Sequence, residues 1–431
     1  GLEAEGVPIL GTSPEAIDAA EDRGRFEALA RELGVAQPKN GTAFSLEDAL
    51  RVAAEVEYPV LIRPSYVLGG RGMQIVYDPE SLAEFFAAAV RVAPGHPVLI
   101  DQFLEDAFEA DVDSISDGQR CVIGGVMQHI EDAGIHSGDS ACVMPPYLIT
   151  EDQVAEMKEY TRQFAAKLGV IGLMNVQYAV KNGIVYVLEV NPRASRTIPF
   201  VSKTTGVPLA SLAAGTMVGK SLEELGVKDD VGHPYVAVKE AVFPFSKMAG
   251  VDLVLGPEMR STGEVMGIAD SFGMAFAKAQ ISADGSLPLG GAVLVTVHDA
   301  DKPTVTAIAR RFHEMGFRIL ATEGTAKYLR ARGVPATRVL KVHEGRPNPV
   351  DLLVSGQVQL LINTPLGKLT QRDDYILRRV ALQHRVPYTT TMSAAAAASD
   401  AIIALRSRTG EVRSLQEWHQ LAKVSLAEQT A

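Results

Sequence analysis

Apolar residues in the first two thirds of the chain repeat with two different spacings. Four stretches carry apolar side chains every three or four positions and so predict helices: residues 15–34, 45–56, 78–92 and 151–168. Ser45 precedes one of these helices as an N-cap residue, and Gly169 follows another. Short β-rich runs lie between them at 58–65 and 97–104 and predict strands. This part of the chain is predicted to be α+β.

Two hairpins are also predicted here. The runs within residues 109–127 flank Asp117-Gly118, a strong hairpin-turn dipeptide, and a second pair of runs flanks residues 181–183. Residues 129–147 have no period and predict an ordered loop. Residues 211–230 read as helical and then polar, and residues 234–285 mix short strands and turns.

The pattern changes after Gly290-Gly291. From there, strand-like runs alternate with helical ones up to about residue 392, which predicts a parallel α/β unit. We therefore expect a multidomain chain of α/β and α+β parts. The predicted division is residues 1–20, 21–215, 216–285 and 286–431, with the third segment packed on the second.

The register of the second hairpin can be argued from its apolar face. Pairing Val180 with Ile184 across a three-residue turn makes one face wholly apolar, with Tyr178 opposite Tyr186 and Val176 opposite Leu188. The opposite face then collects polar side chains, with Val187 among them: Asn175, Gln177, Glu189 and Asn191.

Arg193 and Arg196 follow this polar face immediately. Oxygen ligands beside arginines suit a hard cation that bridges phosphate oxygens, and arginines neutralise charge as a phosphoryl group moves. A solvated hairpin edge with ordinary ion pairs is the alternative interpretation.

A glycine-rich segment follows the strand that ends near Arg63. It reads Gly69-Gly70-Arg71-Gly72, and backbone N–H groups there could reach a phosphate, with Arg63 and Arg71 as counter-charges. It is not a Walker A motif, because no Gly-Lys-Ser/Thr follows. A structural hairpin is the alternative that these residues alone favour.

The strand 98–104 leads into a linker with Glu109 and Asp111. Such an exit could hold adenine by its backbone and ribose by a carboxylate, and an edge strand with a polar end is the alternative. The loop around His136 is polar and contains glycines. His136 could donate to a phosphate, although a lone histidine in a loop is more often structural.

The bulk composition limits the function classes. A chain of 431 residues is too long for one core, and its net charge of -11 disfavours nonspecific nucleic-acid binding. Cys121 and Cys142 have no CxxC neighbour, so zinc and redox motifs are not expected. No apolar run reaches the ~18 residues of a membrane span, and no signal peptide is recognised. We expect a cytoplasmic protein whose start, without Met, looks like a cut within a longer one.

Five segments together resemble the ATP-grasp family and, within it, the second synthetase half of the large subunit of carbamoyl phosphate synthase. They are RPSYVLGGRGM, EADVDSISDG, HIEDAGIHSGDSACVMPP, GLMNVQYAVKNG and LEVNPRASRTIPFVSKTTG, and the resemblance runs from about Pro8 to about Leu405. It implies ATP-dependent phosphorylation of carbamate for pyrimidine and arginine biosynthesis. The implied cofactors are ATP and Mg²⁺ or Mn²⁺, with K⁺ as a further candidate.

The resemblance also implies roles for individual positions in the ATP-grasp domain. Those for ATP are Arg63 and Arg71 at the phosphates, Gln102 and Leu104 at the adenine hinge, Glu109 at the ribose, and Gly134, Ile135, His136 and Ser137 in a nucleotide-contacting loop. The metal ligands are Gln177, Glu189 and Asn191, and the catalytic residues are Asn191, Arg193 and Arg196. The family often has His at position 102, which puts only a side-chain role of Gln102 in doubt.

The last segment is similar to the methylglyoxal-synthase-like regulatory domain of this family. Its implied nucleotide-monophosphate site comprises Lys302, Thr322, Thr325, Lys341, Asn363 and Thr364. Thr322 and Thr325 lie between a strand and a helix, where an anion fits a helix N-terminus. Pro365 stands where the family often has a hydroxyl residue, so the ligand stays open. Glu131, Asp139 and Glu240 match the acids that bind ornithine in bacterial members.

The family subunit has two synthetase halves, each preceded by a small α/β domain, whereas this chain has one half and the end of such a domain. The implied partners are the N-terminal half of the large subunit, on the same or a separate chain, and a glutamine amidotransferase small subunit. An oligomer without nucleic acid or membrane is expected. Two rivals remain: another ATP-grasp carboxylate–amine ligase, and a non-catalytic nucleotide-binding regulatory module.

Overall fold

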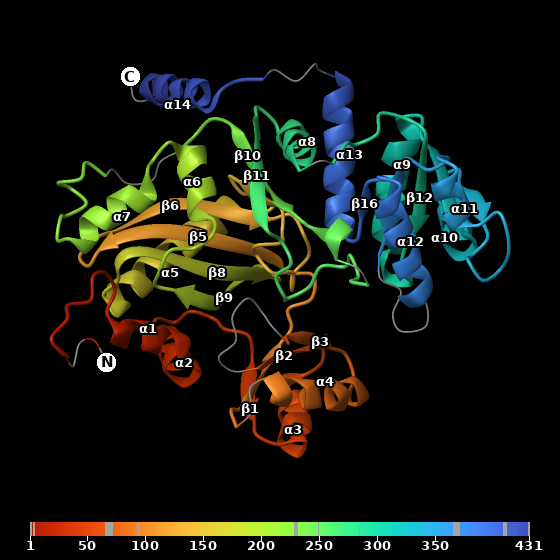
Figure 1. Ribbon diagram of the computed structural model, residues 1–431. Helices are drawn as coiled ribbons and strands as arrows, with labels where there is room; N and C mark the ends of the chain where they lie inside the picture. Colours follow the sequence, from red (N-terminus) through yellow and green to blue (C-terminus); the bar gives the residue numbers. More distant parts are fainter. Residues whose placement is uncertain are drawn as a thin grey trace.

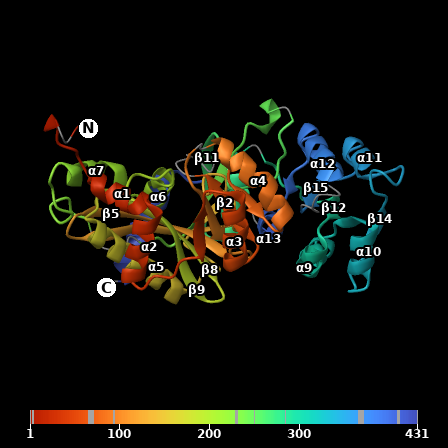
Figure 2. The ribbon, with the colours of Figure 1, turned by 90° about the horizontal axis from the view of Figure 1, so that it is seen from below.

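The computed structural model describes residues 2, 5–64, 72–92, 95–227, 232–248, 250–283, 285–364, 371–407 and 412–429. These residues form three β-sheets, one in the centre of Figure 1, one below it and one to its right, and the molecule is elongated (Figure 2). Helices α1 and α7 lie at one end of it, and α10 and α11 lie at the other (Figure 2).

The chain begins with two helices, α1 (Pro14–Glu21) and α2 (Arg23–Glu32). The prediction of one continuous helix over 15–34 is wrong. Asp22 has extended backbone angles, and its side chain accepts a hydrogen bond from the Arg25 N–H at 2.9 Å. Because an Asp side chain satisfies an otherwise unpaired N–H at a helix start, Asp22 ends the first helix and begins the second.

A four-stranded antiparallel sheet follows, in the order β1-β4-β2-β3. Its strands are β1 (Asn40–Ala43), β2 (Val60–Pro64), β3 (Gln74–Val76) and β4 (Val98–Gln102). Its helices are α3 (Leu46–Val56) and α4 (Pro79–Val92), and both pack on it through one apolar cluster. The predicted N-cap is confirmed, because the Ser45 side chain accepts a hydrogen bond from the Asp48 N–H at 3.1 Å.

The largest sheet is antiparallel throughout, with the order β11-β10-β7-β6-β5-β8-β9. Its strands are β5 (Phe108–Asp117), β6 (Cys121–His129), β7 (Cys142–Met144), β8 (Ile171–Lys181), β9 (Ile184–Asn191), β10 (Val236–Val242) and β11 (Gly263–Ala269). The helices beside it are α5 (Glu151–Leu168), α6 (Ile198–Thr205), α7 (Leu209–Met217) and α8 (Phe272–Ser282).

The two faces of this sheet have different coverings. Helices α1, α2 and α5 pack on the face that carries Val112, Val176 and Tyr178. Helices α6 and α7 pack on the other face, around Ile115 and Leu173. Because side chains alternate along a strand, the polar residues of β5 and β8 lie on the face opposite α5.

Three predictions for this region are wrong. The loop expected over 129–147 contains strand β7, the helix α6 was not predicted, and the strands and turns expected over 234–285 include helix α8. These elements are short or uniformly apolar, so their sequences carry no clear period.

The last unit is the parallel α/β fold that the alternating pattern predicts, with strand order β14-β13-β12-β15-β16. Its strands are β12 (Ala292–Thr296), β13 (Arg318–Thr322), β14 (Thr337–Val339), β15 (Leu360–Asn363) and β16 (Tyr388–Thr389). Its helices are α9 (Lys302–Glu314), α10 (Glu323–Arg330), α11 (Pro349–Val354), α12 (Gln371–Gln383) and α13 (Met392–Ser407). Helices α9 and α13 cover one face, and α11 and α12 cover the other.

The predicted boundary at 285/286 stays a prediction, and two helices beyond it contact elements before it. Residues of α13 pack against α8. Helix α14 (Leu415–Gln429) lies near α6 and β10, away from the five-stranded sheet (Figure 1). There Trp418 is buried, with its ring edge-on to Tyr235 at 5.3 Å, and His419 Nε2 lies 2.7 Å from the Lys203 carbonyl oxygen.

Candidate active site and effector site

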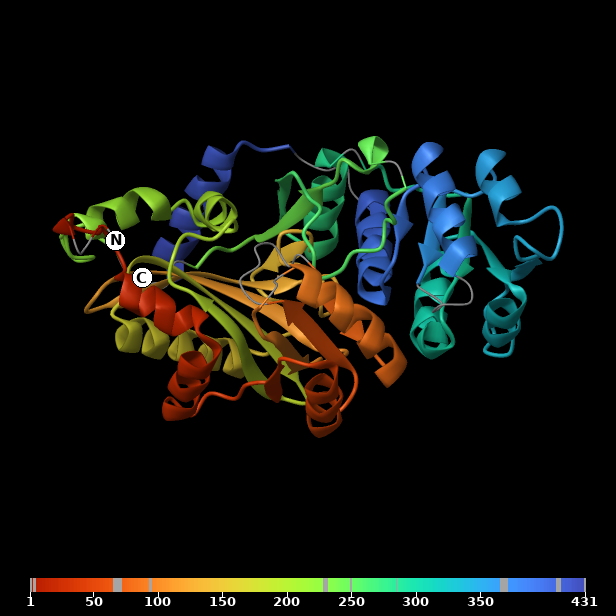
Figure 3. The same ribbon diagram turned by 60° about the horizontal axis from the view of Figure 1, so that its bottom comes forward.

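The four-stranded sheet and the seven-stranded sheet approach each other beside β9 (Figure 3). The contact is direct, because Arg63 Nη2 at the end of β2 lies 3.9 Å from Glu189 Oε2 on β9. The residues predicted to bind ATP come from both sheets and from the loop after β6. This junction is the candidate active site.

The β8–β9 hairpin carries the predicted metal ligands on one face, although its predicted register is wrong. Lys181 pairs with Ile184 across a two-residue turn, in which Asn182 and Gly183 have φ of 53° and 81°. A register shift between Gln177 and Tyr178 then places Gln177 opposite Glu189 and Asn175 opposite Asn191.

The shift arises because the two-residue turn and the apolar core demand different registers. The primed turn fits the twist of a hairpin and is favoured by Asn-Gly. Val185 and Val187 therefore face the core, and Tyr186 and Leu188 lie on the other side, where the prediction had placed the reverse. One extra residue at the bulge restores the polar pairing beyond it.

The three predicted metal ligands lie together at the end of this hairpin. Asn191 Nδ2 donates to Glu189 Oε1 at 2.8 Å, and Gln177 faces Glu189 across the strand pair. The adjoining Arg193 Nη2 donates to Asn191 Oδ1 at 3.0 Å. One carboxylate and two amide oxygens form a donor set that Mg²⁺ or Mn²⁺ accepts. The described residues contain no cluster of three or more His, Cys, Asp or Glu that could hold a metal ion. The prediction that Gln177, Glu189 and Asn191 hold a metal ion therefore rests on their combination of one carboxylate and two amide oxygens.

Arg63 reaches this cluster from the opposite sheet. Its Nη1 lies 3.3 Å from Asp101 Oδ2 on the neighbouring strand, and Arg23 of α2 forms a further ion pair with Asp101. Burial opposes the charge of Arg63, but Asp101 and Glu189 together raise its pKa above the ordinary value. Arg63 is thus a fixed cation at the mouth of the site. The predicted counter-charge Arg71 lies outside the described residues.

An apolar cluster lies at the hinge between the two sheets. Leu104 and Ala107 of the hinge pack with Ala179 of β8, and Tyr186 and Leu188 of β9 pack against them. Gln102, the other hinge residue, donates its backbone N–H to the Lys39 carbonyl at 2.7 Å. Apolar side chains beside a polar strand end suit a flat base that also needs hydrogen bonds.

Glu109, the predicted ribose-binding acid, contacts the predicted nucleotide loop directly. Glu109 Oε1 accepts a hydrogen bond from the Gly134 N–H at 3.0 Å. Gly134 has φ of 89°, and a Cβ there would lie 2.7 Å from the Phe103 ring, so close packing and backbone angle both require glycine.

The rest of the nucleotide loop is held at several points. The loop residue Ile135 is buried, His136 N–H donates to the Gly256 carbonyl at 2.9 Å, and Gln177 Nε2 donates to Ser137 Oγ at 3.1 Å. Burial lowers the pKa of His136, which favours its neutral form. The buried Lys239 Nζ donates to the Ser137 and Ser140 carbonyls at 3.2 and 2.7 Å.

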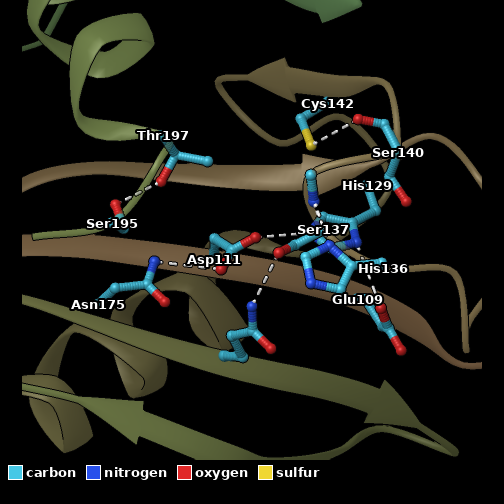
Figure 4. A network of polar contacts seen from close by, with 12 residues as sticks. Glu109, Asp111, His129, His136, Ser137, Ser140, Cys142, Asn175, Ser195 and Thr197 are labelled. Atoms are coloured by element: carbon cyan, nitrogen blue, oxygen red, sulfur yellow. Dashed lines mark hydrogen bonds and ion pairs between the residues drawn. The ribbon is translucent and has the colours of Figure 1, made fainter. Parts of the chain in front are cut away.

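A buried polar network lies behind these groups, and part of it was not predicted from the sequence (Figure 4). His129 Nε2 lies 2.6 Å from Asp111 Oδ2, and Asn175 Nδ2 donates to Asp111 at 3.1 Å and to Asp113 at 3.0 Å. Burial alone would raise the pKa of Asp111, but hydrogen bonding and the charge of His129 bring it below its ordinary value. Asp113, His129 and Lys239 were missed. The alternation of Glu109, Asp111 and Asp113 along one strand could have indicated the acids.

The predicted junction acids lie on separate loops and strands near β16. Glu131 Oε2 accepts from Thr391 Oγ1 at 2.8 Å, and Glu240 Oε2 is buried with no hydrogen-bond partner among the described residues. Burial raises the pKa of Glu131 to about 7, and burial with the charge of Glu131 raises that of Glu240 to about 8. Asp139 is used differently, because its carboxylate accepts the backbone N–H groups of Arg260 and Ser261.

The predicted nucleotide-monophosphate residues gather at the carboxyl edge of the five-stranded sheet. They lie at the ends of four parallel strands: Lys302 after β12, Thr322 at the end of β13 with Thr325 in the first turn of α10, Lys341 after β14, and Asn363 and Thr364 at the end of β15. The central strand β12 is the point where the strand order reverses, and ligands of open parallel sheets bind at such a point.

The side chains of this set differ in what they contact. A Cβ on Gly324 would lie 3.2 Å from Lys302 Nζ, so that cation lies at the N-terminus of α10, where Thr322 makes no side-chain cap. Asn363 is buried, and both ends of its side-chain amide are already hydrogen bonded within the protein. Its N–H donates to Asp374 at 3.0 Å, and its oxygen accepts from Arg378 at 2.7 Å.

Comparisons with known proteins agree with this geometry. Residues 22–225 match the family model described as carbamoyl-phosphate synthase L chain, ATP binding domain, and residues 304–390 match the model described as MGS-like domain. The biotin carboxylase domain of the Hydrogenobacter thermophilus 2-oxoglutarate carboxylase superposes with a TM-score of 0.54 at 18% identity, over 65% of this chain and 69% of that one. This likeness concerns the fold alone. No helix among the described residues is long and apolar enough to cross a membrane.

Two curated relatives are similar over nearly the whole chain. The carbamoyl phosphate synthase large chain of Gemmatimonas aurantiaca is 61% identical over all of this chain, which spans 39% of the relative's length. The C-terminal section of the carbamoyl phosphate synthase large chain of Aquifex aeolicus is 51% identical, over 97% of this chain and 82% of the relative. The chain therefore belongs to the carbamoyl phosphate synthase large-chain family.

Proposed function

We propose that this chain carries the site at which carbamate is phosphorylated by MgATP to give carbamoyl phosphate and ADP. The observation that carries the proposal is the convergence of Gln177, Glu189 and Asn191 beside Arg193, with Arg63 facing them from the other sheet. Family membership supports it. Because the chain spans only 39% of the Gemmatimonas relative, the activity of the whole protein is part of the proposal.

ATP would lie between the two sheets. The adenine would lie against the apolar cluster at Leu104 and bond to the hinge backbone, and Glu109 would accept from the ribose hydroxyls. The nucleotide loop and Arg63 would hold the phosphates, since backbone N–H groups and a guanidinium both favour anions. This arrangement places the terminal phosphate toward the end of β9.

The chemistry needs mostly positioning and charge neutralisation. A carbamate oxygen attacks the γ-phosphorus, the bond to the bridging oxygen breaks, and ADP leaves with that electron pair. Arg193 and Arg196 would stabilise the negative charge shared between carbamate and the moving phosphoryl group. Gln177, Glu189 and Asn191 would hold Mg²⁺ or Mn²⁺, which when bound neutralises phosphate oxygens. K⁺ is a further candidate, because Ser140 Oγ is buried without a hydrogen-bond partner among the described residues.

The five-stranded unit would bind a nucleotide monophosphate without chemistry. Its phosphate would lie at the start of α10, with Thr322, Thr325, Lys302 and Lys341 around it. The acids Glu131 and Glu240 would bind a diamine cation such as ornithine at the junction. Ornithine carries a positive charge that would relieve the repulsion between two close carboxylates.

The proposed partners are the N-terminal half of the large subunit and a glutamine-hydrolysing small subunit, which would supply the ammonia for carbamate. An assembly in the cytoplasm, serving pyrimidine and arginine synthesis, completes the proposal. No observation favours another ATP-grasp ligase over this function, and the match of residues 304–390 to the MGS-like model supports the function proposed.

The test is ATP formation from carbamoyl phosphate and MgADP, with the separate binding of MgADP measured by calorimetry. We expect turnover that requires a divalent cation and disappears in Arg196→Ala. Tight MgADP binding without any turnover, in the chain alone and after addition of the N-terminal half of a relative, would favour the non-catalytic regulatory module.

A further inference from the structure

A buried carboxylate, Asp113, is hydrogen bonded to the loop that carries the two catalytic arginines. This arginine loop comprises residues 192–197. Asp113 has no exposed surface. Its Oδ1 accepts from Ser195 Oγ at 2.7 Å and from Asn175 Nδ2 at 3.0 Å, and its Oδ2 accepts from Thr197 Oγ1. Both neighbours of Arg196 are therefore tied to one side chain of the sheet.

Thr197 bonds to Asp113 and does not cap the helix that follows it. It is the N-cap residue of α6, where a threonine hydroxyl ordinarily accepts a helix N–H, yet it makes no side-chain cap. Its hydroxyl donates instead to Asp113 and lies 2.8 Å from Ser195 Oγ. The backbone N–H groups at the start of α6 thus receive no side-chain acceptor from Thr197, and the arginine loop gains a bond that holds it in place.

The same carboxylate connects the arginine loop to the ribose side of the site. Asn175 joins Asp113 to Asp111, and Asp111 contacts His129. His129 Nδ1 in turn lies 3.3 Å from Glu109 Oε2. Figure 4 shows how Glu109, His129, Asp111, Asn175, Ser195 and Thr197 follow one another across the sheet. One buried network therefore spans both ends of the proposed nucleotide site.

The three donors fit an ionised carboxylate and no close substitute. A carboxylate only accepts, so it satisfies Ser195, Thr197 and Asn175 together, whereas an asparagine must present N–H groups to some of them. Burying an acid is unfavourable unless its bonds are all made, and a half-satisfied network is unstable.

We propose that Asp113 is a positioning residue of the phosphoryl-transfer site, which fixes Ser195 and Thr197 and through them the direction of Arg196. The inference rests on the proposed function. It predicts that loss of the carboxylate leaves nucleotide binding in place and removes the interaction that Arg196 makes with the transferred phosphoryl group.

The experiment compares Asp113→Asn with Arg196→Ala and the double variant in the whole chain. It measures kcat and KM for ATP formation, and the affinities for MgADP alone and for MgADP with aluminium fluoride, a mimic of the moving phosphoryl group. We expect Asp113→Asn to lower kcat and the aluminium fluoride affinity by about 100-fold, the scale for a lost transition-state donor, with MgADP affinity changed less than about threefold. The double variant should be no worse than Arg196→Ala alone.

Ser114→Ala is the matched control. Ser114 is the next residue on the same strand and equally buried, but its hydroxyl donates to the Met174 carbonyl and does not touch the loop. If Asp113→Asn fails to fold, Ser195→Ala removes one of the three bonds and should lower kcat in the same direction, by about tenfold.

The outcomes separate this inference from the proposed function. Full activity of Asp113→Asn beside an inactive Arg196→Ala would overturn the inference alone. Independent, multiplying losses in the double variant would also overturn it, because Asp113 would then act on something other than Arg196. Full activity of Arg196→Ala would overturn the proposed role of that arginine and the inference with it.

Discussion

The two anion sites proposed for this chain are built on opposite principles. The candidate active site lies on an antiparallel sheet, where neighbours along one hairpin supply Gln177, Glu189 and Asn191. The effector site lies on a parallel sheet, where residues far apart in sequence meet at the carboxyl ends of the strands, as Lys302 and Thr322 do. The first fixes side chains through buried networks, and the second offers a helix N-terminus and lysines.

The difference suggests what each site can do. A phosphoryl-transfer site must hold several charges in place before the reaction, and its groups are therefore tied to one another. A site that only binds can rely on fewer ionic contacts. Substitutions should thus act strongly and non-additively in the first site, and modestly and singly in the second.

The largest effect is expected from Glu189→Gln in the active site. Losing the metal-bridging carboxylate leaves phosphate charge unneutralised, which costs several kcal/mol, so ATP formation should fall by about a thousandfold or more. Steady-state kinetics at saturating Mg²⁺ checks this, with the exposed Glu159→Gln as control. Near-normal turnover would show that the hairpin face does not hold the metal.

The next effect concerns the joint between the two regions. Arg378 is buried and donates two bonds to Asp252, from Nε at 2.8 Å and Nη2 at 2.7 Å, and a third to Asn363. Removing one partner of such a pair typically costs about 3–5 kcal/mol, so Arg378→Ala should destabilise the C-terminal unit by that amount. Denaturant unfolding followed by hydrogen exchange measures it.

Arg379→Ala is the control for this joint, because Arg379 bonds only to the backbone carbonyls of Phe245 and Met248 among the contacts described. It should cost clearly less. If the two variants lose equal stability, the Asp252 pair is not what joins the regions.

In the effector site, Lys341→Ala should weaken nucleotide-monophosphate binding by about 1.5–3 kcal/mol, the scale of a charged hydrogen bond. Calorimetry with uridine and inosine monophosphates should use the whole chain, since α13 also packs against α8 and α14 packs outside the predicted C-terminal domain. Lys327→Ala, an exposed lysine on α10, is the matched control. The absence of heat with either nucleotide at millimolar concentration would leave a plain structural unit.

The smallest expected effect is a pH dependence at the junction acids. The pKa values of about 7 for Glu131 and about 8 for Glu240 mean that both carry protons below pH 7 and lose them as the pH rises. A diamine cation needs the ionised forms, so ornithine should bind about tenfold more tightly at pH 8.5 than at pH 6.5. Calorimetry in buffers of different ionisation enthalpy would count the protons released, and Glu240→Gln should abolish most of the dependence.

Without ligand, the free energy of unfolding of the chain should fall as the pH rises, whereas ornithine affinity should increase. Both folded pKa values lie above the ordinary value of 4.5, so the folded chain holds protons that the unfolded chain has released. The contribution of these groups to stability is present below about pH 4.5 and is lost as the pH rises toward 8. Thermal unfolding that shows no trend in this window would contradict the burial of the pair.

The features that the sequence predicted best are those that depend on neighbouring residues. The Ser45 cap, the helix 151–168 that ends at Gly169 and the hairpin at Asp117-Gly118 all follow from neighbouring residues, and the structure contains each of them. Prediction failed where two local demands compete. At the β8–β9 turn, the preference of Asn-Gly for a two-residue turn opposed the apolar pairing, and a bulge settled the conflict.

The sequence by itself determined that Gln177, Glu189 and Asn191 lie on one hairpin, the parallel α/β pattern of the last unit, and the motifs that place the chain in its family, whereas the bulge that brings the three onto one face came from the structure. Only the tertiary structure decided that Asp113 reaches Ser195 and Thr197, that Arg63 meets Glu189, and that α14 returns to the first sheets. The physical reason is distance along the chain. Periodicity fixes which side a residue faces, but contacts between remote segments depend on packing that no local pattern encodes.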